Sequence, residues 1–265
     1  MIEMENVFLG RNEAPIGADT WNLLDTVMIE AAKSQLAGRR LLTLEGPFGF
    51  GLKVLPLSDC ELEEGLYTSS FVPLNVIKSG FSLGKRDLAA FERDKLAFDG
   101  GPVACAAMDC AAKEDQIIFQ GFTGSSGLMN VQGANSQTLT KWDKVGTAAD
   151  QIIEAVTKLD DAGFHSGYCM ALAPSLYNLL LRRYPQGDGT ELDHIRTIVS
   201  EGIVKAPILK KGGVILASGR QFSSLCIGQD MVVGYNGPAG DGLEFYILES
   251  LALVVRVPEA ICVLK

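Results

Sequence analysis

Histidine is almost absent from this chain: of its 265 residues only His165 and His194 are histidines. A metal centre built on several imidazoles is therefore excluded. The six cysteines do not compensate, because no two of them form a CxxC pair. Cys105 and Cys110, the closest two, are five residues apart and would lie off-face on a helix. The sequence predicts no metal site.

Long apolar runs and a basic leader are also lacking. No stretch approaches the ~18 consecutive apolar residues of a membrane-spanning helix. The first residues include Glu3, Glu5 and Glu13, where a secretory signal would be basic and then apolar. We therefore expect no membrane partner, a cytoplasmic location and reduced cysteines.

Positive charge is scarce and scattered. The chain has 23 Lys and Arg against 32 Asp and Glu, for a net charge of −9, and its adjacent basic pairs are Arg39-Arg40, Arg182-Arg183 and Lys210-Lys211. Proteins that bind phosphate backbones need clustered Lys and Arg. The composition therefore predicts no nucleic-acid partner.

Motifs for nucleotide binding and hydrolysis are incomplete. Gly80–Lys85 has three residues between its glycines, where a phosphate-binding loop has four. Cys169, with His165 near it in sequence, and Ser126 are the remaining candidate nucleophiles. We expect Cys169 to be a buried thiol in a strand and His165 to lie in a turn. The chain is predicted not to be an enzyme, and a Cys or Ser hydrolase is the alternative.

Apolar residues, in contrast, are abundant: they make up 47% of the chain, and the mean hydropathy is +0.18. Without a membrane span, this predicts either a large core or surfaces that contact other subunits. The C-terminal region is especially apolar. Leu225–Tyr235 and Leu243–Lys265 are predicted to be strands joined by a reversal at Asn236–Gly242, which holds three glycines and a proline. We expect this terminus to be buried.

The remaining pattern predicts mixed helices and strands. In the first half the pattern predicts a helix at Asp19–Gly38, a short strand at Leu41–Gly51 and a two-stranded excursion over 52–83. It then predicts a short helix at Arg86–Arg93, a central buried helix at Val103–Asp115 and a strand at Ile117–Phe122. In the second half helices and strands are mixed along the chain. The predicted helices are Thr147–Asp161, Ser175–Tyr184 and Glu191–Glu201, and the predicted strands are Tyr168–Ala173, Ile203–Ala206 and Gly213–Ser218. The change of pattern near 135–145 predicts a boundary between two lobes.

Short blocks along the chain resemble, in order and spacing, the encapsulins, which are bacterial and archaeal shell proteins related to the major capsid proteins of tailed phages. The blocks are Gln35–Arg40, Leu44–Gly49, Phe81–Leu83, Phe91–Arg93, Gln116–Gly121, Gly127-Leu128, Ile227–Asp230, Gly234-Tyr235 and Val257–Ala260. The resemblance covers the chain from about Trp21 onward.

The resemblance implies an α+β fold of the tailed-phage major capsid protein type. It assigns the N-terminal helix with the start of the P-domain to 1–51, an E-loop to 52–83 and the P-domain with its spine helix to 84–135. It assigns an A-domain to 136–220 and C-terminal strands that return to the P-domain to 221–265. It also implies self-assembly into an icosahedral shell of roughly sixty copies, the number that this symmetry requires of one unique subunit.

Two sites follow from the resemblance. Cargo enzymes of the family dock through short C-terminal peptides, and the matching peptide-binding residues are Ala32, Arg39, Leu41, Asp230, Met231, Val233 and Tyr235. The loop matching the family's fivefold opening gives the pore residues Gln186, Gly187, Asp188, Gly189 and Thr190. A ring of Asp188 carboxylates would favour cations.

The resemblance also implies the partners and the cofactor expectation. Cargo in the family includes ferritin-like proteins and dye-decolourising peroxidases, which connects these shells to iron storage. Some relatives bind flavin through a stacking Trp, but Arg86 stands at the matching position, so no cofactor is expected. We therefore predict an encapsulin shell protein whose pores control small-molecule access. The alternative in the same structural class is a prophage major capsid protein.

Overall fold

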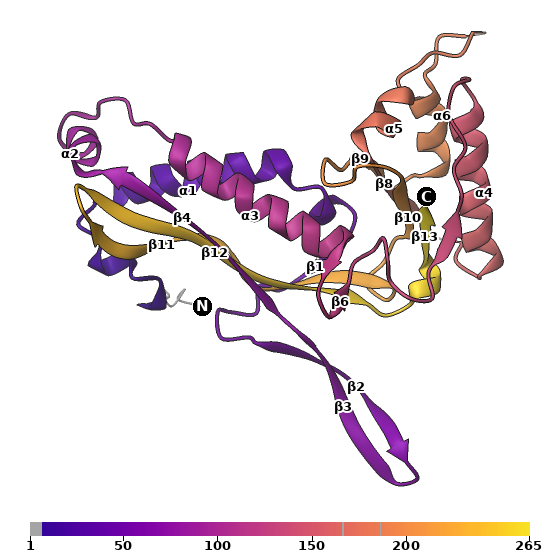
Figure 1. Ribbon diagram of the computed structural model, residues 1–265, viewed down its shortest axis with the longest axis horizontal. Coiled ribbons are helices and arrows are strands. Elements are labelled where there is room, and N and C mark those ends of the chain that lie inside the picture. The colour runs from indigo at the N-terminus through magenta and orange to yellow at the C-terminus, as the bar shows by residue number, and fades with distance from the viewer. Residues whose placement is uncertain (1–6, 166, 186) are drawn as a thin grey trace. The chain divides into compact units, whose positions relative to one another are not determined.

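The computed structural model describes residues 7–165, 167–185 and 187–265 (Figure 1). Contacts within the chain divide it into two compact units. Unit 1 comprises Met1–Gln35, Glu45–Glu114 and Cys226–Ala252, and unit 2 comprises Leu36–Leu44, Asp115–Leu225 and Leu253–Lys265. Each unit is thus built from segments that are far apart in the sequence.

A four-stranded sheet in the order β1-β11-β12-β4 supports unit 1. Its strands are β1 (Thr43–Glu45), β11 (Ser223–Ala239), β12 (Gly242–Val255) and β4 (Asn75–Gly84). β4 and β12 pair antiparallel, from Gly84 opposite Gly242 to Asn75 opposite Leu251. The first predicted C-terminal strand is confirmed, and the second is confirmed as far as Val255. The reversal is confirmed as a short turn at Gly240-Asp241, because β11 continues through Asn236 to Ala239.

Alternation along β12 sends its side chains to opposite faces of this sheet. Phe245 stacks against Phe81 at 5.5 Å between ring centroids and meets the edge of Trp21 at 5.8 Å. The next residue, Tyr246, packs instead against Leu9 in a small apolar cluster. Unit 1 therefore buries apolar side chains on both faces of its sheet.

Three helices belong wholly or mainly to unit 1: α1 (Ala18–Gln35), α2 (Lys85–Asp94) and α3 (Gly101–Phe119). α1 buries Leu24, Met28 and Ala32, a stripe with the four-residue spacing of a helix face. Two short 3-10 turns precede it, η1 (Val7–Leu9) and η2 (Arg11–Glu13). The predicted helices are confirmed, and α3 begins earlier and ends later than expected.

A long hairpin leaves the sheet of unit 1. Its strands β2 (Val54–Glu63) and β3 (Leu66–Pro73) pair antiparallel, and Figure 1 shows the hairpin projecting away from the sheet. The predicted two-stranded excursion is confirmed for these residues and wrong for β4. Buried Ile77, Phe81 and Leu83 alternate along β4, and such a half-buried strand needs a sheet to pack on.

Unit 2 contains a five-stranded sheet in the order β7-β13-β10-β8-β9. Its strands are β7 (Asn135–Gln137), β13 (Ile261–Leu264), β10 (Gly213–Ala217), β8 (Tyr168–Leu172) and β9 (Gly202–Lys205). The outer pairs β13–β7 and β8–β9 are parallel, and the inner pairs β10–β13 and β10–β8 are antiparallel. Three helices accompany the sheet: α4 (Thr147–Asp161), α5 (Pro174–Leu179) and α6 (Glu191–Ile198).

The main core of unit 2 lies between these helices and one sheet face. Ile152 and Leu159 of α4 and Ile195 of α6 are fully buried with Met170 of β8 and Ile215 of β10. The helix Thr147–Asp161 is confirmed residue for residue, whereas α5 and α6 are each shorter than predicted. Among the described residues, no helix combines the length and apolarity needed to cross a bilayer.

Two predicted strands have the wrong bounds. Residues Ile117–Phe119 form the last turn of α3, because buried Ile118 and Phe119 continue its helical stripe, and only Gly121–Phe122 (β5) pairs, with Ser125–Ser126 (β6). The last strand does not run unbroken to Lys265. It ends at Val255, and after the short turn η4 (Pro258–Ala260) the chain enters unit 2 as β13, since proline cannot donate to a ladder.

Candidate functional site

The predicted cargo-site residues of β11 lie on both faces of the strand. Met231, Val233 and Tyr235 are separated by single residues, so they share one face, and Asp230 lies on the other. Tyr235 packs on Phe245 at 5.4 Å between ring centroids, so the three face the same side as Phe245. The exposed Asp230 carboxylate accepts the Met231 backbone N–H at 2.8 Å.

Burial separates these residues further. Val233 is 0% exposed and Ala32, on α1, is also buried, so both belong to the core of unit 1. Met231 and Tyr235 are half-buried. The accessible predicted residues in unit 1 are therefore Asp230, Met231 and Tyr235.

The other two predicted cargo residues belong to unit 2. Arg39 is half-buried in η3 (Gly38–Arg40), and Leu41 follows it. The Asp115 carboxylate holds the start of this turn by accepting the Gly38 backbone N–H at 2.8 Å. A Cβ at Gly38 would lie 2.5 Å from Cδ1 of Ile118, so glycine is required there. The backbone conformation around Arg39 is thus fixed from inside the unit.

The loop predicted to form the pore connects α5 to α6. Gln186 lies outside the described residues, Gly187, Asp188 and Gly189 are exposed, and Thr190 is half-buried. Thr190 begins α6 with a capping box: its hydroxyl accepts the Asp193 N–H at 3.2 Å, and the Asp193 carboxylate accepts the Thr190 N–H at 3.0 Å. The Thr190 hydroxyl also donates to the Asp193 carboxylate at 2.6 Å. This bond and the one from the Thr190 N–H favour the charged form and lower the pKa of Asp193.

The two ends of this loop are tied together. The Tyr184 N–H donates to the Gly189 carbonyl at 3.1 Å, and the Glu191 N–H donates to the Arg182 carbonyl at 3.0 Å. The Tyr184 hydroxyl also lies 3.0 Å from Nδ1 of His194. The exposed tip is therefore short and stands on a closed stem.

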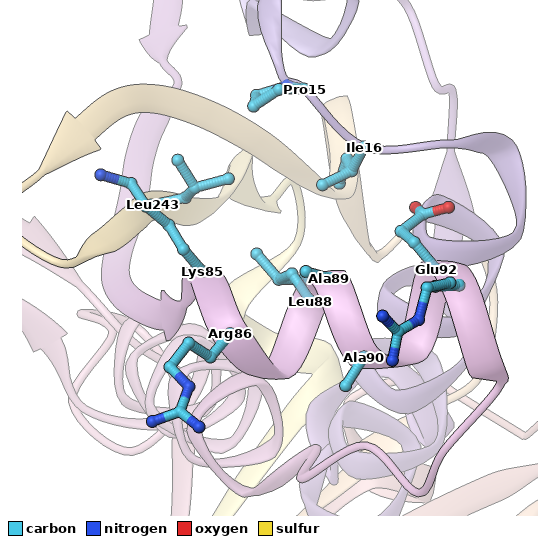
Figure 2. Close-up of a pocket in the computed structure, with 10 residues that line it drawn as sticks. Pro15, Ile16, Lys85, Arg86, Leu88, Ala89, Ala90, Glu92 and Leu243 are labelled. Atoms are coloured by element: carbon cyan, nitrogen blue, oxygen red, sulfur yellow. The ribbon is translucent and has the colours of Figure 1, made fainter.

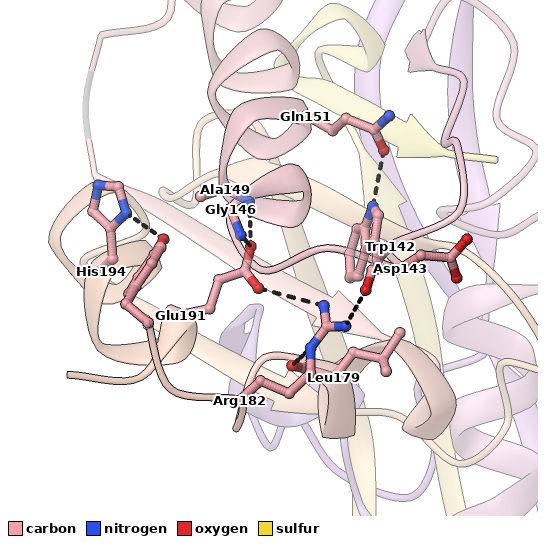
Figure 3. A network of polar contacts seen from close by, with 10 residues as sticks. Trp142, Asp143, Gly146, Ala149, Gln151, Leu179, Arg182, Glu191 and His194 are labelled. Carbon is pink, nitrogen blue, oxygen red and sulfur yellow. Dashed lines mark hydrogen bonds and ion pairs between the residues drawn. The ribbon is translucent and has the colours of Figure 1, made fainter. Parts of the chain in front are cut away.

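A buried carboxylate anchors the stem to α4 (Figure 3). Glu191 is 0% exposed, and its Oε1 accepts the backbone N–H groups of Gly146 at 2.9 Å and Ala149 at 3.1 Å. Its Oε2 faces Nη2 of Arg182 at 3.6 Å. Arg182 also donates Nε to the Leu179 carbonyl at 2.9 Å. Glu191 therefore satisfies free N–H groups at the start of α4 and joins them to the loop.

Sequence reasoning did not identify this anchor. It placed Glu191 at the start of a helix and treated Arg182 only as one of a basic pair. The signal in the sequence is an acid and a base that bracket the glycine-containing loop. That signal becomes specific only when α4 is placed beside them, because the N–H groups that Glu191 accepts lie more than forty positions earlier in the chain.

The Cys169 and His165 pair is not assembled. Cys169 donates its Sγ–H to the Leu41 carbonyl at 3.3 Å, and burial raises the pKa of its thiol to about 11. His165 Nδ1 instead lies 3.2 Å from Asp160. Tyr168, which precedes Cys169 and so faces the opposite side of β8, also donates to Asp160, at 2.6 Å. A thiol in this environment is a poor nucleophile.

The other candidate chemistry is also weakly supported. In the part of the chain that the structure describes, the Ser126 hydroxyl has no hydrogen bond to a histidine or carboxylate, and no three His, Cys, Asp or Glu side chains gather as a metal site. Burial raises the pKa of Cys110 to about 12 and that of Cys262 to about 11. The exposed thiols are Cys60 and Cys105.

Arg86 lines an open pocket on α2 (Figure 2). The pocket holds about 800 Å³ and has an apolar floor that includes Leu88 and Leu243. Lys85, Arg86 and Arg93 also line it. The pocket therefore combines an apolar surface with three cations.

Comparison with known proteins gives one consistent family. A family model described as an encapsulating protein for peroxidase matches residues 4–252. The type 1 encapsulin shell protein EncA of Myxococcus xanthus is 32% identical over 276 aligned residues, covering 97% of this chain and 96% of that protein. The match thus extends over nearly the whole of both chains.

Two solved structures establish the fold. The virus-like particle protein of Pyrococcus furiosus superposes with a TM-score of 0.78 at 18% identity, covering 94% of this chain and 100% of that one. The capsid protein of the Myoviridae phage XM1 superposes with a TM-score of 0.58 at 12% identity, covering 84% of this chain and 88% of that one. The predicted α+β fold of tailed-phage capsid proteins is confirmed.

Proposed function

Because this chain belongs to the encapsulin family of shell proteins, we propose that its copies assemble into a closed, hollow icosahedral particle that encloses cargo enzymes in the cytoplasm. The shell contains roughly sixty copies, the number that icosahedral symmetry requires of one unique subunit. The polypeptide itself carries out no reaction and binds no cofactor. Its function is to enclose an enzyme and to select the small molecules that reach it.

The β2–β3 hairpin is the observation that best supports assembly. Its large apolar side chains face solvent in the single chain: Leu62 is 63% exposed, and Tyr67 and Phe71 are each 62% exposed. A two-stranded hairpin without a packing partner is marginally stable at best in water. A second copy would cover these side chains.

Assembly is tested by expressing the chain alone. Sedimentation velocity and negative-stain microscopy should find closed particles of one size. A well-folded monomer in physiological buffer would refute the proposal. Nucleic acid in the purified particles would instead favour the prophage capsid alternative, and the net charge of −9 argues against it.

We infer that a cargo peptide binds on unit 1 at the accessible predicted residues of β11, which are Asp230, Met231 and Tyr235. Met231 is the informative position, because it is half-buried and can change without opening the core. A charge at the fully buried Val233 would unfold unit 1 and would test nothing about cargo. Met231→Asp should leave particles intact and remove the enzyme that co-purifies with them.

The matched control is Ile153→Asp, which places the same charge on an exposed apolar residue of α4. Particles are purified from the native cells and their contents are quantified by mass spectrometry. Retention of cargo at the wild-type level in Met231→Asp would contradict the site. A ferritin-like protein or a dye-decolourising peroxidase is the expected cargo class.

We also propose that the loop 185–190 lines a pore. The predicted pore residues that the structure describes are Gly187, Asp188, Gly189 and Thr190. Asp188 is exposed and at the tip of the tied stem, so a symmetric ring of these carboxylates would attract cations. Asp188→Lys should slow the entry of Fe²⁺ into preformed particles, measured by stopped-flow with an enclosed chelator. An unchanged entry rate would contradict a pore at this loop.

A further inference from the structure

We propose that His194 makes the pore at the loop 185–190 sensitive to pH, so that protonation of its imidazole slows the entry of cations. This inference rests on the proposed pore and adds how cation entry through it is regulated. Three observations within unit 2 carry it: the position of His194 against the loop stem, the charges around that stem, and the scarcity of histidine in the chain.

His194 lies near the start of α6 and contacts both ends of the loop (Figure 3). Its Nδ1 is 3.0 Å from the Tyr184 hydroxyl, and the two rings lie 6.0 Å apart between centroids. Its backbone N–H donates to the Thr190 carbonyl at 3.3 Å. The imidazole is therefore held at the base of the exposed tip.

The contact with Tyr184 is compatible with both charge states of the imidazole. Burial raises the pKa of Tyr184, and the carboxylates of Glu191 and Asp150 raise it further, so the phenol keeps its proton. It can then donate to Nδ1 of a neutral His194 whose proton is on Nε2. When both ring nitrogens carry protons, the Tyr184 oxygen can accept instead. Protonation therefore changes the charge at the stem without requiring the loop to unfold.

The other charges on α6 are already paired. The buried Glu191 carboxylate faces Arg182 at 3.6 Å, and the exposed Asp193 carboxylate faces Arg196 at 3.7 Å. Each pair contributes little net charge to the stem. The charge of His194 is therefore not masked by its neighbours on the helix.

The unpaired charges near the stem are carboxylates. Asp188 at the tip and Asp150 in α4 have no ion pair within the described residues. Arg183 precedes Tyr184 in a segment that bridges to Thr190, and successive side chains of an extended segment point to opposite sides. Arg183 therefore points away from the Tyr184 side of the stem, and an imidazolium at His194 would offset the carboxylates.

The symmetry of a pore multiplies this change. Each copy around the opening contributes one Asp188 carboxylate and one His194 imidazole, so protonation cancels about one negative charge per subunit. Rings of charged side chains select the ions that enter a pore, and charge of one sign raises the entry rate of the opposite ion by roughly tenfold or more. Cancelling the ring charge should therefore slow the entry of a divalent cation.

The composition points to a single residue. Imidazole is the side-chain group that ordinarily changes its charge between pH 5 and 8, and His165 and His194 are the two histidines of the sequence. His165 follows α4, and its Nδ1 lies 3.2 Å from Asp160 rather than beside the loop. A change in cation entry across this pH range should therefore depend on His194 and not on His165.

The test measures the entry of Fe²⁺ into preformed particles with an enclosed chelator, by anaerobic stopped-flow at pH 7.5 and pH 5.5. The wild-type rate is divided by the His194→Gln rate at the same pH, which cancels the pH dependence of the chelator. This ratio should fall roughly fivefold or more at the lower pH, because Gln stays uncharged and its amide oxygen can still accept from Tyr184. His194→Arg should be slow at both pH values. His165→Gln is the matched control and should follow the wild type, and negative-stain microscopy confirms intact particles at each pH.

Salt provides a second measurement. At 1 M NaCl the screening length falls to about 3 Å, so the change in the ratio should be lost. A ratio that is the same at both pH values in low salt, or one that still changes at 1 M NaCl, would overturn the switch. If Asp188→Lys slows entry at pH 7.5, the pore stands whatever the result for His194. An unchanged rate in Asp188→Lys would refute the pore and the switch together.

Discussion

The buried carboxylate of Glu191 should be a sensitive position in unit 2, because it joins the loop stem to the start of α4. Glu191→Gln retains the size of the side chain and removes its charge. The variant weakens two charge-assisted bonds from Gly146 and Ala149 and leaves Arg182 without its carboxylate. A hydrogen bond to a charged group contributes about 1.5–3 kcal/mol, and Arg182 retains part of its hydration because its side chain is 28% exposed. We expect a loss of about 2 kcal/mol.

The assay is amide hydrogen exchange on assembled particles. A loss of about 2 kcal/mol corresponds to roughly 30-fold faster opening of the first turn of α4, so exchange in peptides that cover 142–152 should accelerate by that factor. Glu30→Gln makes the same chemical change at an exposed position on α1 and should leave exchange unchanged. Protection of α4 within twofold of wild type in Glu191→Gln would refute the anchoring role.

Three further outcomes are expected. Gly234→Ala should destabilise unit 1, because a Cβ there would lie 2.3 Å from Cζ of Tyr246; an unchanged thermal unfolding temperature would contradict this packing. Brief alkylation of the folded subunit with iodoacetamide, read by mass spectrometry, should label only the exposed thiols, Cys60 and Cys105. Because the pKa of Asp193 is lowered by its bonds to Thr190, its contribution to stability is present above its unfolded pKa of about 3.9 and is lost as the pH falls through the lower folded value. The wild type and Asp193→Asn should therefore differ in urea unfolding at pH 6 and converge near pH 2, and a constant difference would contradict this linkage.

The candidate sites depended on different kinds of information. Resemblance to the family located β11 and the loop 185–190, and alternation in the sequence already separated Met231, Val233 and Tyr235 from Asp230. That Val233 is buried and Met231 accessible follows from packing against other elements, which the sequence does not specify. The Glu191 anchor likewise required α4 and α6 to be placed side by side.

The sequence by itself determined the elements whose pattern is complete within one segment. Thr147–Asp161 has apolar residues at helical spacing over its full length. The glycines of Asn236–Gly242 predict a chain reversal, which the structure places at Gly240-Asp241, where Gly240 has a positive φ of 52°. Tertiary structure decided the rest. The apolar residues Ile117–Phe119 fit either a strand or a helix. They are helical in the structure because their side chains complete the buried stripe of α3. The last strand ends at Val255, because Pro258 interrupts it. Ile261–Leu264 then pair with β10 in the sheet of unit 2, and β10 lies more than forty residues earlier in the chain.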